Sequence, residues 1–325
     1  MSTSGEEKKN SRKKVIITIL VLLLLLIAFG GTYAFRLLGK VNKVDIDKNN
    51  LEVNTELDSK DITNIALYGI NTTDGMNTTE GENGRSDTIM ILTIDAKHNK
   101  LKLSSMMKDV YVDVNNHGKT KLTNAYAYGG PELAINTLNS NFALNIDKFI
   151  AVNFNGLPKI IDQLGGVSVN ITNDDLKYIN KYIDGLNESN KTNSPHITQA
   201  GIQTIDGTQA TAYATIIHDG GDHNRTSRQR DVMDSLFNKL TNISITEMPG
   251  LLNELLPLAY TNISSTDLLS IGSDILGMKV STMEEEIFPN DKNSHAEVID
   301  GVDYLVIDKD AVIEEMHKFI FEEQN

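Results

Sequence analysis

Three of the six arginines in this chain fall within six positions, at Arg225, Arg228 and Arg230. If this segment is a helix, Arg225, Arg228 and Gln229 share one face, because residues three and four apart are neighbours on a helix. Asp222 lies just before them, near the expected start of that helix. Guanidinium groups donate paired hydrogen bonds to phosphate or carboxylate, and a helix N-terminus adds backbone donors. The pattern predicts an oxyanion-binding site; a surface helix with Arg–Asp pairs is the alternative.

Arg85 and Asp87 form a second candidate group, at the end of a polar stretch (71–86) and directly before an apolar run. A loop that leads into a strand can hold an arginine and a carboxylate rigidly at the rim of a pocket. Asp87 is a candidate ligand for Mg²⁺, which prefers carboxylate and phosphate oxygens. Lys108, at the end of a later strand, is a candidate to neutralise phosphate. A capped turn at 85–87 and an ordinary exposed lysine are the structural alternatives.

The composition excludes several other chemistries. The chain of 325 residues has no cysteine, which excludes disulfides, iron–sulfur clusters, thiolate zinc sites and cysteine nucleophiles. It has 30 basic and 44 acidic residues and a net charge of −14, whereas nonspecific nucleic-acid binding requires a basic surface, so we expect no nucleic-acid partner. The sequence contains neither a G-x-S-x-G elbow nor a G-x-x-x-x-G-K-[ST] loop, and its seven histidines lack the spacing of metal ligands.

The amino-terminal region predicts a membrane anchor. Residues 15–35 are 21 consecutive uncharged residues, which as a helix span about 31 Å, close to the ~30 Å hydrocarbon core of a bilayer. Five lysines and arginines lie within residues 1–14, so the positive-inside rule places this tail in the cytoplasm and the bulk of the chain outside. A signal peptide cleaved near Ala34 is the alternative; both interpretations export the remainder.

The exported part resembles a bacterial surface protein more than a eukaryotic one. Seven N-x-[ST] sequons suggest a glycosylated eukaryotic ectodomain. An ectodomain of this size without cysteine is unusual in that setting, however, because exported eukaryotic domains commonly carry disulfides. We therefore expect the surface of a Gram-positive bacterium.

Strands and helices alternate along the chain from Asp61. Apolar runs predict buried strands at 64–70, 88–94, 149–154 and 167–171, and alternation predicts a strand with one wet face at 100–106. Helices are predicted at 131–142, 156–164 and 310–321, the second ending at Gly165-Gly166, and residues 187–193 are a predicted surface loop. This order indicates an α/β fold with a mixed central sheet flanked by helices in three layers. We assign residues 36–60 to a juxtamembrane stalk and 61–325 to one extracytoplasmic domain.

Six segments, in order, resemble the LytR-CpsA-Psr family over a core of about 64–240. They are GRSDTIMILTID (84–95), KDVYVDV (108–114), KLTNAYAYGGPELAINTLN (121–139), VNFNGLPKIIDQLGGVSVNI (152–171), IDGTQATAYA (205–214) and DHNRTSRQRDVM (222–233). A short basic tail followed by one membrane helix also suits this family.

The resemblance implies a function. It implies the activity that family members share, which is Mg²⁺-assisted phosphotransfer on the outer face of the Gram-positive membrane. They move an anionic glycopolymer, such as teichoic acid or capsular polysaccharide, from a polyprenyl-pyrophosphate carrier onto peptidoglycan, and an apolar tunnel holds the lipid. The resemblance makes Arg85 and Asp87 a phosphate clamp and a metal ligand, and makes Arg225 and Arg228 pyrophosphate contacts. Gln229 and Asp222 lie beside these arginines, with Asp222 as a candidate base.

Four positions depart from the family pattern. Asn71 stands where the family usually has aspartate; its amide oxygen can still bind Mg²⁺. Lys108 stands where arginine is common, and Thr215 and Ile217 replace a pair of arginines. A charge-assisted contact contributes about 1.5–3 kcal/mol, so the loss of two predicts weaker turnover. The alternative is therefore a regulatory protein of the same fold that binds polyprenyl phosphate or wall glycan without turnover. A transcriptional attenuator that contacts DNA is a third possibility, which the topology and acidic charge argue against.

Overall fold

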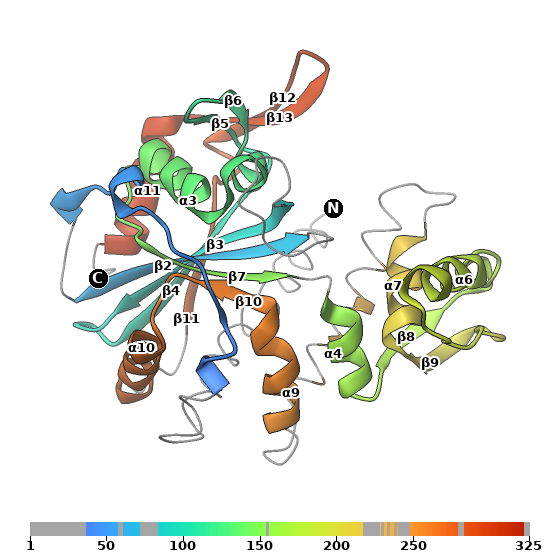
Figure 1. Ribbon diagram of the computed structural model, residues 1–325. Coiled ribbons are helices and arrows are strands. Elements are labelled where there is room, and N and C mark those ends of the chain that lie inside the picture. The colour runs from blue at the N-terminus through green and yellow to red at the C-terminus, as the bar shows by residue number, and fades with distance from the viewer. Residues whose placement is uncertain are drawn as a thin grey trace. The chain divides into compact units, whose positions relative to one another are not determined.

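The structure is a computed structural model that describes residues 37–57, 61–71, 84–153, 156–216, 228, 231–232, 235–236, 239, 248–278 and 283–321 (Figure 1). The chain divides into two compact units. We call Leu38–Asn155 with Pro257–Asn325 the sheet unit, and the described residues of Gly156–Leu256 the hairpin unit. The predicted tail (1–14) and membrane helix (15–35) lie outside the described residues. Within the described part, no helix has the length and apolar character needed to cross a bilayer.

A mixed seven-stranded sheet forms the centre of the sheet unit, in the order β1-β10-β7-β2-β3-β4-β11. Its strands are β1 (Asn42–Lys43), β2 (Ile62–Asn71), β3 (Arg85–Asp95), β4 (Lys100–Met106), β7 (Lys148–Asn153), β10 (Ala259–Thr261) and β11 (Met283–Phe288). β3 pairs antiparallel with β2 and β4, whereas β7 pairs parallel with β2 and β11 parallel with β4. The central strands are nearly continuous apolar runs, as expected of strands buried on both faces. The predicted mixed sheet is confirmed.

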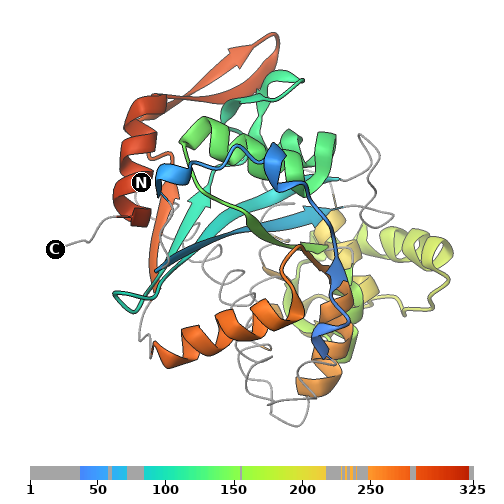
Figure 2. The ribbon, with the colours of Figure 1, turned by 60° about the vertical axis from the view of Figure 1, so that its left-hand side comes forward.

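Helices cover both faces of this sheet (Figures 1 and 2). α3 (Leu122–Phe142) and α11 (Lys309–Phe321) lie on one face, where Phe142 and Phe319 join Tyr68 and Phe149 in the main core. α10 (Ser265–Gly277) lies on the opposite face. The short helices η1 (Lys48–Asn50) and η2 (Thr55–Leu57) precede β2. A central sheet flanked by helices is thus as predicted.

Two hairpins extend from the α3 side of the sheet. They are β5 (Tyr111–Val114) with β6 (Gly118–Lys121), and β12 (Ser294–Ile299) with β13 (Val302–Ile307). They are joined by a contact between the rings of Tyr111 and Tyr304, which are tilted by 51° with centroids 4.6 Å apart, and by a backbone bridge from Val110 to Leu305.

The described part of the predicted stalk (36–60) is folded into the sheet unit. β1 pairs with β10, so Asn42 and Lys43 belong to the sheet. Leu51 is fully buried in the main core. The polar composition that suggested a stalk reflects residues whose side chains bind the rest of the unit, such as Lys48, which pairs with Asp147 at 2.8 Å.

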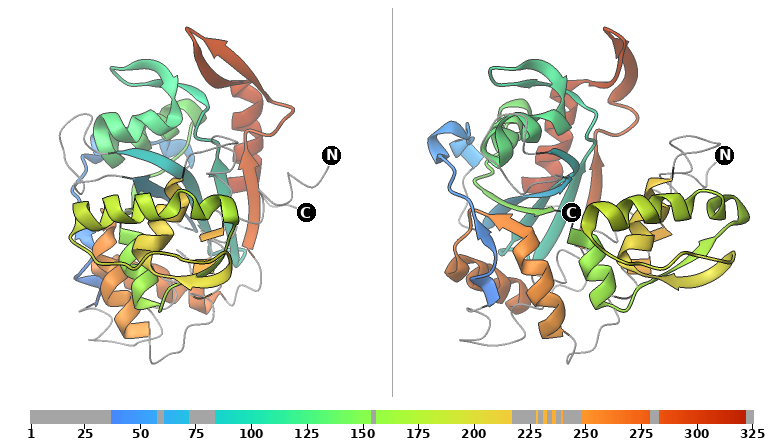
Figure 3. Two further views of the ribbon diagram at one scale, coloured as in Figure 1. Left: turned by 90° about the vertical axis from the view of Figure 1, so that its right-hand side faces the viewer. Right: turned by 45° about the vertical axis from the view of Figure 1, so that its right-hand side comes forward.

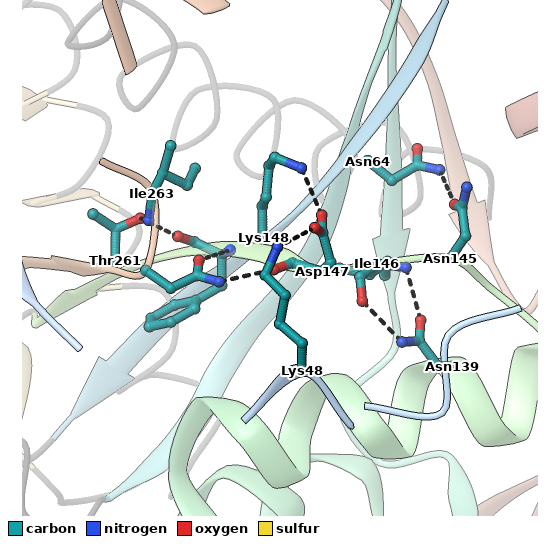
Figure 4. Close-up of polar contacts among 11 residues, drawn as sticks. Lys48, Asn64, Asn139, Asn145, Ile146, Asp147, Lys148, Thr261 and Ile263 are labelled. Atoms are coloured by element: carbon teal, nitrogen blue, oxygen red, sulfur yellow. Dashed lines mark hydrogen bonds and ion pairs between the residues drawn. The ribbon is translucent and has the colours of Figure 1, made fainter. Parts of the chain in front are cut away.

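Figure 4 shows how polar side chains fix the loop before β7. Asn139 accepts a hydrogen bond from the Ile146 N–H (3.0 Å) and donates one to the Ile146 carbonyl (2.9 Å). Asp147 accepts from Lys48 and from Lys148. Burial alone raises the pKa of Asp147, but these hydrogen bonds outweigh burial and hold the pKa below its ordinary value. The start of β7 is therefore tied to both α3 and the segment before β2.

Two predicted features of the secondary structure are wrong, and a third is incomplete. β4 has no wet face, because β11 pairs along its outer side and Lys102, buried at 1% exposure, donates to the Ile320 carbonyl of α11. The helix predicted at 131–142 is confirmed as the second part of α3, because non-helical backbone at Gly129 and Gly130 separates it from a first part that begins at Leu122 and was not predicted. Residues 187–190 continue a helix, since the Asn187 side chain bonds both backbone groups of Ser194 and stabilises the helix end.

The hairpin unit contains one antiparallel strand pair and several helices; its residues 167–215 are yellow-green to yellow in Figure 3 and Met248–Leu255 is orange. Its elements are α4 (Leu157–Gln163), β8 (Val167–Ile171), α5 (Asn173–Leu176), α6 (Ile179–Asn190), β9 (Gly201–Ile205), α7 (Gly207–Thr215) and α9 (Met248–Leu255), followed by η4 (Leu256–Leu258). Gly207 permits the close approach of α7 to α4, because a Cβ there would lie 2.0 Å from the Pro158 carbonyl oxygen. The predicted helix at 156–164 and strand at 167–171 are confirmed, with Gly165 and Gly166 both at positive φ.

Candidate functional site

Arg85, Asp87 and Lys108 come together at one edge of the central sheet. Arg85 begins β3 and lies opposite Asn71, the last residue of β2. Because β4 runs antiparallel to β3, its last residue, Met106, lies opposite Ile89, and Lys108 follows at the same edge. Lys108 Nζ lies 3.0 Å from a carboxylate oxygen of Asp87, and the two side chains are each 44% exposed. The sheet thus joins two sequence segments that we selected separately.

Buried hydroxyl groups fix this edge to the start of α3. Thr123 donates from Oγ1 to the Ser86 carbonyl (2.9 Å), and Ser86 donates weakly from Oγ to the Thr123 carbonyl (3.5 Å). The Thr123 N–H donates to the Lys108 carbonyl (3.0 Å). Both hydroxyl side chains are buried. The backbone that carries Arg85, Asp87 and Lys108 is therefore held by one set of contacts.

The charges at this edge can be rearranged by a ligand. Arg85 is exposed, and a second ion pair joins Lys121 to Asp109 at 2.9 Å. Exposed ion pairs contribute only about 0–1 kcal/mol, so an incoming phosphate can take Lys108 from Asp87 at little cost. The edge therefore suits an exchangeable phosphate contact better than a permanent structural pair.

Arg228 lies in the interior of the hairpin unit, and the expectation that it is exposed on a helix is wrong. Its side chain is 7% exposed, and Nε donates to Asp175 Oδ1 at 2.8 Å. Nη1 donates to the Ile216 carbonyl at 3.1 Å. Thr172 donates to the other oxygen of Asp175 from its N–H and its hydroxyl. Burial alone raises the pKa of Asp175, but the bonds from Thr172 and Arg228 outweigh burial and lower it.

Tyr213 and Thr215 lie close by in the sequence, on α7. Tyr213 is buried, and its hydroxyl donates to an oxygen of Asp231 at 3.3 Å. Burial, with the charge of Asp231, raises the pKa of Tyr213 well above its ordinary value. Thr215 is exposed and donates from its hydroxyl to the Thr211 carbonyl of its own helix (2.7 Å). Ala210 and Ala212, two apolar residues of α7, are buried.

Comparison with known proteins decides the family. A model described as the LytR_cpsA_psr family matches residues 34–319. The chain belongs to the LytR-CpsA-Psr family. The match extends well beyond the core of about 64–240 on which the sequence resemblance rests. It also includes residues 37–57, in agreement with their packing in the sheet unit.

Relatives in the family carry two kinds of name. The regulatory protein MsrR of Staphylococcus aureus is 30% identical over 233 residues, which are 70% of this chain and 66% of MsrR. The chain thus spans slightly less than two thirds of the length of that relative. The polyisoprenyl-teichoic acid–peptidoglycan teichoic acid transferase TagU of Oceanobacillus iheyensis is 29% identical over 272 residues, 80% of this chain and 76% of TagU.

A solved structure shares the fold. The crystal structure of protein gbs0355 from Streptococcus agalactiae aligns with a TM-score of 0.53 and 24% identity, covering 83% of this chain and 92% of that protein. At this identity the likeness concerns the fold alone.

Several family-motif residues lie outside the described part of the chain. These are Asp222, Arg225, Gln229 and Ile217, together with the side chain of Asn71. The structure therefore describes Arg85, Asp87 and Lys108 in one unit and Arg228 in the other, and each is described by itself.

Asp87 offers carboxylate oxygens that could bind Mg²⁺. Mg²⁺ is commonly bound by one or two carboxylates plus substrate phosphate oxygens, and the half-exposed carboxylate of Asp87 fits that role. Among the described residues there is no group of three or more histidines and acidic residues that would form a complete site without substrate.

Sequence analysis missed the residues that support these side chains. Ser86 and Thr123 have no signal of their own, because their contact depends on how α3 returns to the sheet. Asp175 does have a signal in the sequence, because Thr172 and Asp175 match the [ST]-x-x-[DE] capping box, which the structure contains in full. That pattern predicts a helix start but not the ion pair with Arg228.

Proposed function

We propose that this protein transfers an anionic glycopolymer from a polyprenyl-pyrophosphate carrier to peptidoglycan. The observation that carries the proposal is the family match over 34–319, together with TagU, a relative named as a teichoic acid transferase to peptidoglycan. In the reaction, a peptidoglycan hydroxyl oxygen attacks the polymer-side phosphorus. The bond from that phosphorus to the bridging oxygen breaks, polyprenyl phosphate leaves, and the hydroxyl proton passes to a base.

The edge that carries Arg85 and Lys108 supports this chemistry. Breaking a pyrophosphate develops negative charge on the bridging oxygen and on the nonbridging oxygens, and preorganised cations stabilise that charge. Lys108 Nζ is held by an exposed carboxylate that it can exchange for phosphate. The attachment of Ser86 to Thr123 limits the motion of the backbone directly after Arg85.

Residues of the segment 222–229 have roles in this reaction as well. Arg225 and Gln229 contact the pyrophosphate, and Asp222 accepts the proton of the acceptor hydroxyl. Arg228 helps through position: its guanidinium is fixed by Asp175 and Ile216, so it supports the segment that carries Arg225 and Gln229. Its own contact with pyrophosphate remains part of the proposal.

Two further features complete the proposal. Residues 15–35 anchor the protein by one membrane helix with residues 1–14 in the cytoplasm, on the outer face of a Gram-positive cell membrane. Mg²⁺ assists, with Asp87 and Asn71 among its ligands, and supplies neutralisation of phosphate charge.

A second candidate function is binding without turnover, in a regulatory role. Thr215, at a position where the family has arginine, uses its hydroxyl within its own helix. The relative MsrR is named a regulatory protein. A protein of this kind would hold the carrier lipid or the wall glycan and release no polyprenyl phosphate.

The experiment that separates the two functions measures release of polyprenyl phosphate. The full chain, solubilised in detergent, is mixed with a polyprenyl-pyrophosphate-linked saccharide, Mg²⁺ and peptidoglycan. We expect release that depends on peptidoglycan and is lost in Arg85→Ala and Arg225→Ala. Lys318→Ala, which removes an exposed cation from α11, is the matched control and should release product at the normal rate. Tight binding of the lipid without release would favour the second candidate, and Thr215→Arg with Ile217→Arg should then restore release.

A further inference from the structure

A polar cleft lies on α3 within the sheet unit, apart from the edge that carries Arg85. Its volume is about 440 Å³, within the range of small-molecule sites, about 300–1,000 Å³. Three segments line it: η1 and the residues after it, the turn between β5 and β6, and the middle of α3. The polar residues that line it are Asn49, Asn50, Glu52, Asn115, Asn116, Glu132 and Asn136.

One wall of the cleft is fixed by side chains from successive turns of α3. Glu132 accepts hydrogen bonds from the Asp47 N–H and from Asn50 Nδ2, both at 2.8 Å. Asn136 donates to the Asn50 carbonyl at 2.6 Å. One turn further on, Asn139 donates to the Leu51 carbonyl at 2.7 Å. The segment 47–51 is thereby held in one position along the helix.

The opposite wall is fixed as well. Asn141 of α3 donates to the Asp113 carbonyl (2.7 Å) and accepts from the Asp113 N–H (3.2 Å), which attaches β5 to the helix. At the turn, the His117 ring stacks on the Tyr128 ring with centroids 4.5 Å apart. The cleft is therefore preformed, and a ligand that enters it orders little backbone.

Asn136 supplies the observation that points to a ligand. Its side chain is 4% exposed, it lines the cleft, and its Oδ1 atom has no hydrogen-bond partner among the described residues. Leaving a buried acceptor without a donor costs about 1–3 kcal/mol. A ligand that brings a hydroxyl or N–H donor to Asn136 would recover that cost.

The chemistry of the lining selects an uncharged ligand that both donates and accepts hydrogen bonds. Among the described residues that line the cleft there is no lysine or arginine and there are two glutamates, which disfavours an anionic polymer. Asparagine amides donate and accept at once, as a row of sugar hydroxyls requires. A cation is less suited, because both oxygens of Glu132 already accept hydrogen bonds and the described residues contain no group of three acidic or histidine side chains.

We propose that this cleft binds an uncharged glycan segment through the amides of Asn115, Asn116 and Asn136. The assignment of that glycan as the peptidoglycan strand that accepts the polymer rests on the proposed function. Binding of the glycan itself does not, because the described residues that line the cleft come from η1 and the residues after it, the β5–β6 turn and α3, and do not include Arg85, Asp87 or Lys108.

The test measures binding of chitotetraose, a neutral β-1,4-linked tetramer of N-acetylglucosamine, to the full chain in detergent by isothermal titration calorimetry. We expect saturable binding that weakens about 2- to 13-fold in Asn115→Ala, since one hydrogen bond contributes about 0.5–1.5 kcal/mol. Asn136→Ala should weaken it similarly. Because Asn136 also donates a hydrogen bond to the Asn50 carbonyl, the melting temperature of the Asn136→Ala variant is measured alongside. Asn115 is exposed, so the Asn115→Ala variant tests binding without a change in folding.

Two controls keep the result specific. Asn190→Ala, an exposed asparagine of α6, should bind chitotetraose normally. Ca²⁺ binding to the unaltered chain that is lost in Glu52→Gln would make the cleft a cation site and overturn the proposal. Absent binding, or binding unchanged in both asparagine variants, would also overturn it. Glycan binding without polyprenyl phosphate release would refute the transferase while leaving the cleft assignment in place.

Discussion

The Arg228–Asp175 and Lys108–Asp87 pairs each join a cationic side chain to a carboxylate, at nearly the same distance, 2.8 and 3.0 Å. Their surroundings differ, with 7% and 5% exposure in the first pair and 44% for each partner in the second. A buried pair cannot lose one partner without leaving an uncompensated charge, whereas an exposed pair exchanges its partner for water or ligand. Both cations come from motifs that suggest phosphate chemistry, yet only Lys108 is free to move toward a ligand at little cost.

Removing Arg228 should have the largest effect on stability. Arg228→Ala leaves the Asp175 carboxylate buried without its cation, and breaking one side of a buried pair costs about 3–5 kcal/mol. Thermal unfolding followed by circular dichroism should show a clear loss of stability in the hairpin unit. The double variant Arg228→Met, Asp175→Leu removes both charges and should recover much of the loss. Normal stability in Arg228→Ala would mean that the pair is exposed in solution.

Removing Lys108 should instead act on ligand binding. A charge-assisted contact contributes about 1.5–3 kcal/mol, so Lys108→Ala should weaken binding of the pyrophosphate-linked lipid by about 10- to 150-fold, with little change in melting temperature. Lys100→Ala is the matched control, because Lys100 also forms an exposed ion pair in β4, with Glu284 at 3.1 Å, at the other end of the strand. Equal effects in the two variants would remove Lys108 from the site.

Acid should weaken the stability that the buried Arg228–Asp175 pair contributes. The pKa of Asp175 is lowered in the folded chain by Thr172 and Arg228 against the effect of burial. The unfolded chain then binds the proton more readily, so the stability gained from Asp175 is fully present above about pH 3.9, the ordinary value for aspartate. That stability is lost as the pH falls through the lower folded pKa. The stability of Asp175→Asn should depend less on pH between about 4 and 2 than that of the unaltered chain, measured by urea unfolding at each pH.

Much of the architecture could be predicted, because it follows from local pattern. The strands around Ile65, Ile91 and Phe149 are apolar runs that only a buried strand accommodates, and they were found close to their observed bounds. The family match likewise depends on segments that can be recognised in the sequence. Errors arose where tertiary contacts decide. A lysine at position 102 suggested a strand face exposed to water. In the structure β11 pairs along β4, and α11 covers Lys102.

The candidate site was predictable as a set of residue types but not as a set of environments. The Arg85 and Lys108 segments were selected one by one, and only sheet register brings them to one edge. Arg228 looked like a surface arginine because its partner, Asp175, is 53 residues away in the chain. Exposure of a charged side chain depends on such distant partners, which spacing within one segment does not reveal.

Asp87→Asn should have the smallest effect on stability and so completes the comparison. It removes the carboxylate of the exposed pair while keeping the shape of the side chain, and such pairs contribute about 0.2–1 kcal/mol. Asp175→Asn makes the same chemical change inside the buried pair and should cost several times more, because Arg228 then keeps its charge without a counterion. Melting temperatures of the two variants, measured side by side at pH 7, give the contrast directly. Equal losses in both would show that exposure does not separate the structural pair from the exchangeable one.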